Sequence, residues 1–268
     1  MALAIRWIKR RYEHSLLSPR RKELELEISN AWGRAIRLIP ASTSESYDEI
    51  HYAVDQGQRL AVVRVNSPFR KTPEDVAPHC AGFPLQPKQR LNHEWNAYSK
   101  LAPHQLSPEP LWRTDDAIAC SWLSWPRASR YLVQHRSRFW EVIQRVLPAI
   151  RAMHDNGVTH LDMNPGNLML DPDSNRVAII DFEFAPSEWI THAQQKGFDY
   201  LRLMADCTKR RRGGRQFEAN VDRMVNLLDQ YVDEESRDAD LRFSTTLLQR
   251  LNANPELCNQ LRRVFRRL

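Results

Sequence analysis

The sequence has 268 residues, of which 42% are hydrophobic and 27% charged, and a formal net charge of +6. This length and composition are typical of a soluble globular protein with one or two domains. No run of eighteen apolar residues is present, which argues against a transmembrane helix. The moderate positive charge favours anionic partners such as nucleotides, phosphorylated sugars or anionic surfaces, and does not by itself indicate nucleic-acid binding.

Cysteine spacing and the first residues together indicate a cytoplasmic protein. The four cysteines are scattered with no C-x-x-C pair, so we expect reduced thiols that do not bind metal. The first apolar stretch, residues 2–5, is cut by Arg6, unlike a secretory signal. Residues 1–19 are basic and predict a terminal helix that is solvated or loosely docked. The alternative is peripheral contact of this segment with an anionic membrane surface.

The first half of the chain is rich in predicted strands. One helix is expected over residues 21–32, ending at Gly33, and another over 88–101. Residues 66–87 hold five prolines and no clear period, so a loop is predicted there. Residues 55–58, Asp-Gln-Gly-Gln, have the composition of a hairpin turn. The expected strands are residues 35–40, 50–54, 60–65, 111–113 and 117–123.

The second half is predicted to be helical. Apolar residues from Phe139 to Met153 recur at helical spacing, and Asn156-Gly157 is a stop signal. Strands followed by helices predict an α+β architecture, with an N-terminal antiparallel sheet lobe and a larger helical C-terminal lobe. We expect a basic helical extension over 1–33, the first lobe over 34–123 and the second over 124–268. Further helices are expected at about 197–208, 215–233, 242–252 and 255–268.

Two motifs in this half indicate phosphoryl transfer. His160-Leu161-Asp162 is followed by Asn167, which gives the pattern His-x-Asp-x-x-x-x-Asn. Asp181-Phe182 follows at the end of a short apolar strand. Pro165-Gly166 lets the chain reverse, so that Asp162 and Asn167 face the same side.

The chemistry of phosphoryl transfer explains these residue types, because it needs positioning and charge neutralisation more than covalent catalysis. A carboxylate must meet the incoming hydroxyl, and Asp162 is the candidate catalytic residue. Magnesium prefers hard oxygen ligands, which the Asn167 amide and the Asp181 carboxylate supply. Either motif alone is equally consistent with surface residues beside an ordinary turn, but both in order and correctly spaced favour the catalytic interpretation.

On these motifs the chain resembles the protein-kinase-like superfamily, and more closely its branch of aminoglycoside phosphotransferases and choline kinases. The resemblance covers about residues 34–208 and is strongest over 158–184. It implies a two-lobe protein-kinase-like fold with ATP and Mg²⁺ as cofactors. Asp181-Phe182-Glu183 and Gly197-Phe198-Asp199 are similar to choline kinases, and the short segment between them, with no Ala-Pro-Glu motif, disfavours a protein kinase.

The resemblance implies nucleotide-binding residues in the first lobe. Arg64 stands where protein kinases carry a strand lysine, and it is expected to contact the phosphates and to pair with Glu94 on the following helix. The alternative for Arg64 is an exposed charge on an edge strand. The backbone of Trp122 and Leu123 is expected to bind the adenine edge, the alternative being that Trp122 belongs to the core or to the wall of the substrate site.

The phosphate loop and the catalytic loop depart from the protein-kinase pattern. Residues 34–58 contain a single glycine, so a G-x-G-x-x-G loop is excluded there. The turn around Ser42, Thr43 and Ser44 is expected to reach the phosphates instead, the alternative being a plain serine-rich surface turn. Asn164 occupies the position of the usual catalytic-loop lysine, as is common in the small-molecule branch.

Three residues around the motifs have predicted supporting roles. We expect His160 to brace the catalytic loop by hydrogen bonds rather than to carry protons. Asp199 is predicted to be structural, bonding to the catalytic loop from a helix start. Glu183 replaces the usual glycine and lines the metal or substrate site, or is a surface residue.

These features predict an ATP- and Mg²⁺-dependent phosphotransferase that acts on a hydroxyl of a small molecule or sugar. The alternatives are a lipopolysaccharide or envelope-glycan sugar kinase, a catalytically inactive pseudokinase that serves as a binding module, and a protein kinase.

Charged segments bear on the choice of acceptor. The basic run 209–215 is either a solvated loop or a site for an anionic acceptor. A group of acidic residues between 229 and 235 would suit a cationic acceptor, or it simply faces solvent. We expect no nucleic-acid partner. The acidic group consists of Asp229, Asp233, Glu234 and Glu235.

Overall fold

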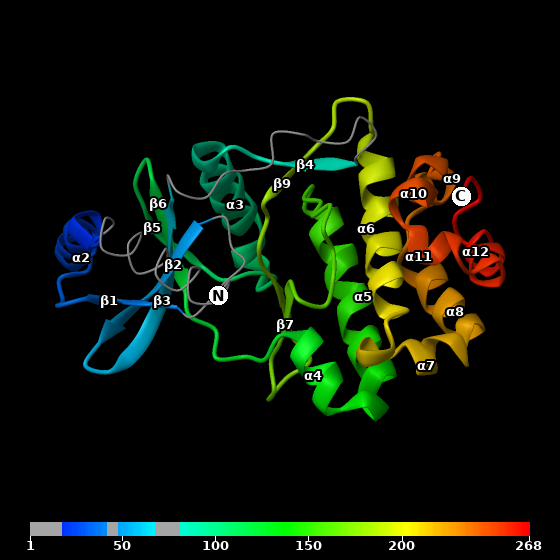
Figure 1. Ribbon diagram of the computed structural model, residues 1–268, viewed down its shortest axis with the longest axis horizontal. Coiled ribbons are helices and arrows are strands. Elements are labelled where there is room, and N and C mark those ends of the chain that lie inside the picture. The colour runs from blue at the N-terminus through cyan, green and yellow to red at the C-terminus, as the bar shows by residue number, and fades with distance from the viewer. Residues whose placement is uncertain (1–17, 42–47, 68–80) are drawn as a thin grey trace, which may run out of the picture. The chain divides into compact units, whose positions relative to one another are not determined.

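The computed structural model describes residues 18–41, 48–67 and 81–268 (Figure 1). Its chain divides into two compact units. Of the described residues, the first unit contains 18–41, 48–67, 86–91 and 109–123, and the second contains 81–85, 92–108 and 124–268. Helix α3 (Pro87–Leu101) therefore contributes its first residues to one unit and the remainder to the other.

The first unit is built on an antiparallel sheet with the strand order β1-β2-β3-β6-β5. Strands β2 and β3 form the predicted hairpin, whose turn has φ values of 46° at Gln56 and 85° at Gly57. Two consecutive positive φ values match the right-handed twist of the flanking strands. The strands are β1 (Arg37–Pro40), β2 (Asp48–Asp55), β3 (Gln58–Asn66), β5 (Pro110–Arg113) and β6 (Ala117–Ser121).

Helix α2 (Ser18–Trp32) supplies part of the core of the first unit. Leu24 and Ile28 are fully buried in one cluster with apolar side chains of β1, β3 and β6, such as Val63. Polar side chains of α2 also fix the start of the sheet, because Glu25 Oε1 accepts a hydrogen bond from the Leu38 N–H at 2.7 Å. The helix is thus part of a folded unit, and it covers the predicted helix over 21–32.

The second unit is mainly helical, with two short ribbons. In one ribbon β4 (Gly82–Pro84) pairs with β9 (Phe184–Pro186), and in the other β7 (Leu168–Leu170) pairs with β8 (Val177–Ile179). Helix α5 (Phe139–Asp155) buries the predicted apolar stripe. The other helices are α4 (Ala128–Gln134), α6 (His192–Cys207), α7 (Gly214–Glu218), α8 (Val221–Tyr231), α9 (Glu234–Asp238), α10 (Arg242–Leu247), α11 (Gln249–Asn252) and α12 (Pro255–Leu261), with 3-10 turns at Ala102–His104, Arg136–Arg138 and Arg210–Arg212.

The predicted α+β class and its order of strands before helices are confirmed. The loop predicted over 66–87 is wrong at residues 82–84, because Phe83 and its neighbours pair with β9, far away in the sequence. The helix predicted over 215–233 is interrupted after Glu218, and that over 242–252 after Leu247. The helix expected over 255–268 ends at Leu261.

Some predictions fall on residues that the structure does not describe. The turn of Ser42, Thr43 and Ser44 and the basic segment 1–17 lie outside the described residues. Among the helices that are described, none has the length and apolar character needed to cross a bilayer. Cys120, Cys207 and Cys258 are buried.

Candidate active site

The catalytic loop connects α5 to β7, and the β7–β8 ribbon joins it to the predicted metal turn. Leu168 lies opposite Ile179 in the ribbon, and the Ile180 N–H donates to the carbonyl of Asn167 at 2.9 Å. Asn167 and the residue that precedes Asp181 therefore sit at the same end of the ribbon. This pairing explains how two motifs separated in sequence come to one site.

Asp162 and Asn167 are directly connected. The Asn167 side-chain N–H₂ donates to the Asp162 carbonyl at 3.0 Å and to its Oδ2 at 3.3 Å, while Asn164 donates to the same Oδ2 at 3.1 Å. The side-chain oxygen of Asn167 takes part in no hydrogen bond with the described residues. An amide held by its nitrogen in this way presents its oxygen as a hard ligand, so Asn167 fits a magnesium ion.

Asp181 lies at a strained point of the backbone. Its φ of 77° is in the left-handed region that residues other than glycine rarely adopt. Its N–H donates to the Tyr98 hydroxyl at 3.3 Å, which itself donates to Oε1 of the fully buried Glu94 at 2.5 Å. The predicted Glu94 therefore contacts the metal turn through Tyr98.

Phe182 anchors the turn that carries Asp181. Its fully buried ring contacts Tyr98 edge-on, with centroids 5.9 Å apart, and lies 4.8 Å from the ring of His160. Glu183 is also buried, at 9% exposed, so the surface interpretation of that residue is wrong. Among the described residues, no three His, Cys, Asp or Glu side chains form a metal site. A metal held by Asn167 and Asp181 would need further oxygens from phosphate or water.

His160 and Asp199 hold the catalytic loop. Asp199 is fully buried and accepts hydrogen bonds from the N–H groups of His160 at 2.9 Å and Leu161 at 2.7 Å. Leu161, with a φ of 63°, is the second strained residue of the site. The His160 ring bonds to the Ile180 carbonyl at 2.9 Å and accepts the Asp162 N–H at 3.3 Å.

The predicted bracing roles of His160 and Asp199 agree with these contacts, but the placement of Asp199 was wrong. Helix α6 begins at His192 and is capped by Thr191, so Asp199 lies in the middle of the helix. The third partner of Asp199 is His154 on α5, with Nε2 to Oδ2 at 3.1 Å. Asp199 therefore ties two helices and the loop together.

Sequence reasoning missed Arg202 on α6. Its guanidinium group lies 2.8 Å from Oδ1 of Asp162, and the side chains of Arg202 and Asp162 are 28% and 29% exposed. A signal for it exists in the sequence, because Arg202 follows Asp199 by three residues and the two share a helix face. Arg202 brings a positive charge next to the predicted catalytic carboxylate, where Asn164 has replaced the lysine of protein kinases.

The first unit holds Arg64 in a buried ion-pair cluster that the sequence did not reveal. Arg64 is 5% exposed, so the edge-charge interpretation is wrong, and it contacts Oδ2 of the buried Asp48 at 3.0 Å. Arg90 on α3 contacts the other carboxylate oxygen of Asp48 at 2.5 Å. The predicted pairing of Arg64 with Glu94 would join residues of different units and stays a prediction.

The structure leaves fewer backbone groups for the predicted contacts with adenine. The Trp122 N–H donates to the Leu60 carbonyl at 2.9 Å and so prolongs the β3–β6 ladder. An N–H used in this way is not available to a base, so the prediction is left with the carbonyl of Trp122 and the backbone of Leu123. The Trp122 ring packs edge-on against Tyr52, with centroids 5.0 Å apart.

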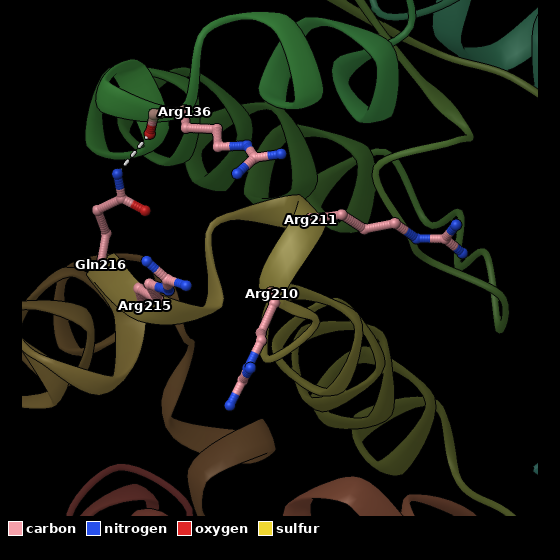
Figure 2. Close-up of a pocket in the computed structure, with 5 residues that line it drawn as sticks. All are labelled: Arg136, Arg210, Arg211, Arg215 and Gln216. Carbon is pink, nitrogen blue, oxygen red and sulfur yellow. Dashed lines mark hydrogen bonds between the residues drawn. The ribbon is translucent and has the colours of Figure 1, made fainter.

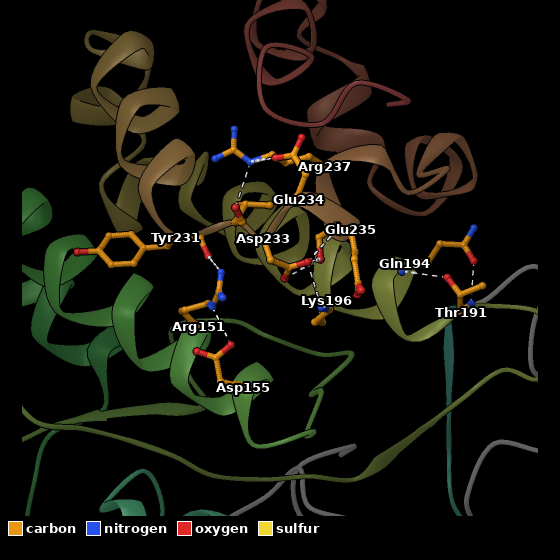
Figure 3. Close-up of polar contacts among 12 residues, drawn as sticks. Arg151, Asp155, Thr191, Gln194, Lys196, Tyr231, Asp233, Glu234, Glu235 and Arg237 are labelled. Carbon is orange, nitrogen blue, oxygen red and sulfur yellow. Dashed lines mark hydrogen bonds and ion pairs between the residues drawn. The ribbon is translucent and has the colours of Figure 1, made fainter.

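Each carboxylate of the acidic group in the second unit forms an ion pair with a basic side chain (Figure 3). Asp233 contacts Lys196 at 3.0 Å and also accepts the Ser236 N–H as the cap of α9. Glu235 lies 3.5 Å from the same lysine. Asp229 contacts Arg237 at 2.5 Å, and Glu234 contacts Arg266 at 2.5 Å. These carboxylates therefore do not form a free anionic pocket for a cationic acceptor.

Comparison with known proteins agrees with this geometry. The model of the phosphotransferase enzyme family matches residues 89–192, which contain the catalytic loop and the metal turn. A serine/threonine-protein kinase, PKH2 of Candida albicans, is 53% identical over 38 residues. That match covers 14% of this chain and only 4% of the kinase.

Solved kinase structures show a weaker, overall similarity. The Rio2 kinase of Chaetomium thermophilum, in a complex with ADP/Mg²⁺-phosphoaspartate, has 14% identity and a TM-score of 0.45, covering 92% of this chain and 75% of that one. The PknI kinase domain of Mycobacterium tuberculosis has 15% identity and a TM-score of 0.45, covering 84% and 86%.

The α+β order of the chain and the two motifs agree with the protein-kinase-like resemblance drawn from the sequence. The segment 89–192, which contains both motifs, is similar to the phosphotransferase enzyme family. The resemblance drawn from the sequence is thereby confirmed.

Proposed function

We propose that the protein transfers the γ-phosphoryl group of ATP, with Mg²⁺, to a hydroxyl of a small molecule or sugar. The observation that supports this most is the convergence of Asp162 and Asn167, within 3.3 Å of each other, at the end of the ribbon that leads to Asp181. In this proposal Asn167 and Asp181 hold Mg²⁺, which neutralises phosphate charge. Glu94, Trp122 and Leu123 keep their predicted roles at the nucleotide, whereas Arg64 would have to leave its buried pair with Asp48 to reach a phosphate.

The chain's own residues would divide the reaction between them. Asp162 orients the acceptor hydroxyl and takes its proton as the acceptor oxygen bonds to phosphorus and the bond to ADP breaks. Arg202, fixed 2.8 Å from Asp162 Oδ1, holds that carboxylate and offers its remaining N–H groups to the transferred phosphoryl oxygens. Asp199 and His160 keep the loop in its strained form.

The structure gives two reasons to favour a small acceptor without cationic character over a protein or an aminoglycoside. The segment after Asp181 is used by β9, paired with β4, and then by α6 from His192, which leaves a short connection for docking a peptide. Each carboxylate of the acidic group at 229–235 is already held in an ion pair with a basic side chain. A sugar kinase acting on envelope glycans remains the second candidate.

Turnover of ATP with and without Mg²⁺ tests this proposal, read as ADP release during a screen of amino alcohols, aminoglycosides, monosaccharides and lipopolysaccharide fragments. The change Asp162→Asn should lower turnover about 10²–10⁴-fold, because the general base is lost. Asp173→Asn, at an exposed loop position, is the matched control and should leave turnover unchanged. Nucleotide binding without turnover on any acceptor would instead support a pseudokinase.

A further inference from the structure

Three residues of the basic run 209–215, namely Arg210, Arg211 and Arg215, line a pocket at the surface of the second unit. A cavity of about 340 Å³ is lined by the side chains of the second unit shown in Figure 2. This volume is in the range of small-molecule sites, roughly 300–1,000 Å³. The lining residues are Arg136, Arg210, Arg211, Arg215 and Gln216.

The backbone that carries these arginines is firmly built. Gly213 has a φ of 100°, and a Cβ there would overlap the buried ring of Phe139. A Cβ at Gly214 would overlap the carbonyl of Thr208. The Gln216 side chain donates to the Arg136 carbonyl at 2.7 Å, which joins the two sides of the pocket. The sequence Gly-Gly is therefore required by close packing, and not by chain flexibility.

The charges of this segment divide into two groups. Asp206 on α6, only 1% exposed, forms ion pairs with Lys209 and Arg212. These contacts hold the basic turn, residues 209–212, against the end of α6. The four arginines of the pocket have no carboxylate partner among the side chains that the structure describes. All four arginines are exposed to solvent, so water and salt screen their mutual repulsion, and their N–H groups are accessible to anions. The side chains are spread apart in Figure 2, which suits several separate anionic groups better than one ion.

Polar contacts connect the predicted catalytic residue with the segment that carries the pocket's arginines, although not with the arginines themselves. Arg202, which holds Asp162, lies 4.0 Å from Oδ1 of Asp206, the anchor of the basic turn. On the other side, the N–H of Ser129 on α4 donates to the Pro165 carbonyl of the catalytic loop at 2.7 Å. The basic turn and the catalytic loop thus share their supporting elements, α6 and α4.

We propose that Arg136, Arg210, Arg211 and Arg215 bind the acceptor, and that this acceptor is a sugar carrying two or more phosphate or carboxylate groups. The inference rests on the proposed phosphotransferase function, and it names the acceptor class of that same reaction. Arginine suits this role because its planar fork donates two N–H groups to one phosphate or carboxylate.

Direct binding tests the site without turnover. Glucose 1,6-bisphosphate is titrated into the full chain by calorimetry, with EDTA and no nucleotide. Wild type should bind, and the variant Arg210→Gln/Arg211→Gln should bind roughly tenfold more weakly or worse, because charge-assisted bonds are lost. Lys22→Gln/Arg37→Gln removes the same number of positive charges from exposed positions of the first unit and should bind within about twofold of wild type.

A parallel titration uses vesicles of anionic phospholipid. Three outcomes would overturn the site: wild type does not bind the sugar bisphosphate, both double variants lose the same affinity for it, or Arg210→Gln/Arg211→Gln weakens binding to the vesicles alone. The last outcome would indicate a membrane contact instead. Asp162→Asn should keep the affinity for the sugar bisphosphate. If wild type binds the sugar bisphosphate but phosphorylates none of the acceptors, the phosphotransferase proposal alone is refuted. Efficient turnover of uncharged sugars by wild type and by Arg210→Gln/Arg211→Gln alike would refute the acceptor site alone.

Discussion

Two aspartates of this protein, Asp48 and Asp162, are both held by arginine but in opposite environments. In the first unit, the side chain of Asp48 is fully buried and contacts Arg64 and Arg90, whose side chains are 6% and 0% exposed. In the second unit, Asp162 contacts Arg202 with both side chains more than a quarter exposed. The aspartate–arginine pair is therefore buried in the first unit and accessible to solvent in the second.

Burial decides what such a pair can do. A buried carboxylate with two guanidinium groups has lost its water, and it depends on its partners for compensation. An open pair keeps water nearby and can exchange its partner for a substrate group at low cost. The Asp48 cluster accordingly fixes the conformation of the strands and α3, whereas the Asp162 pair is suited to meeting a hydroxyl and a phosphate.

The largest expected effect comes from breaking the buried cluster. The change Asp48→Asn should lower the free energy of unfolding by about 3–5 kcal/mol, because Arg64 and Arg90 would be left as buried charges without their shared carboxylate. Denaturant unfolding, followed by circular dichroism, measures this.

The matched control for that variant is an exposed ion pair of the same unit. Asp115 contacts Lys88 at 3.0 Å with side chains 92% and 65% exposed, so Asp115→Asn should cost at most about 1 kcal/mol. Equal stability losses in the two variants would mean that burial does not distinguish the pairs, and the comparison would fail.

The open pair should respond in activity and not in stability. We expect Arg202→Ala to lower kcat about 10–100-fold, which corresponds to about 1.4–2.7 kcal/mol in the barrier, while unfolding changes little. Arg202→Lys should restore part of kcat, since a cation near Asp162 is retained without the planar fork. Steady-state kinetics on the acceptor found by the screen separates kcat from KM.

A structural role for Arg202 would give a different pattern. If the side chain only supported α6, Ala and Lys would both lower the melting temperature and would reduce kcat to the same extent. Arg37→Ala, at an exposed position of β1, is the control for the loss of one arginine and should change neither quantity.

The sequence predicted those parts of the site that depend on local spacing. Asp162 and Asn167 lie in one loop, so their separation along the chain already restricts their distance. The hairpin at 55–58 and the stripe of α5 were predictable for the same reason, since turn composition and helical period are local signals. Asp199 was recognised from its neighbours Gly197 and Phe198, although its place in the helix was wrong.

The remaining features depend on contacts between distant segments. Asp48 and Arg90 are 42 residues apart, and no periodic pattern connects a strand end with a helix start. Strand β4 has only three residues, with glycine and proline at its ends, and it forms because β9 is brought beside it. To predict the role of Arg202, one must know which face of α6 meets the catalytic loop. The predicted contact of Asp199 with that loop indicates this face, because Asp199 precedes Arg202 by three residues.

The smallest expected effect concerns His93 on α3, which shows how burial acts on a titratable group with basic neighbours. Burial, with contributions from His160 and Lys100, holds the pKa of His93 below its ordinary value, and a hydrogen bond with the Phe184 backbone only partly opposes this. The folded state therefore binds fewer protons than the unfolded chain once the pH falls below about 6.5. The stability due to neutral His93 is complete above that pH and is lost as the pH falls through the lowered pKa. Melting temperatures between pH 7.5 and 5 should decline less in His93→Gln than in wild type, and parallel declines would contradict this assignment.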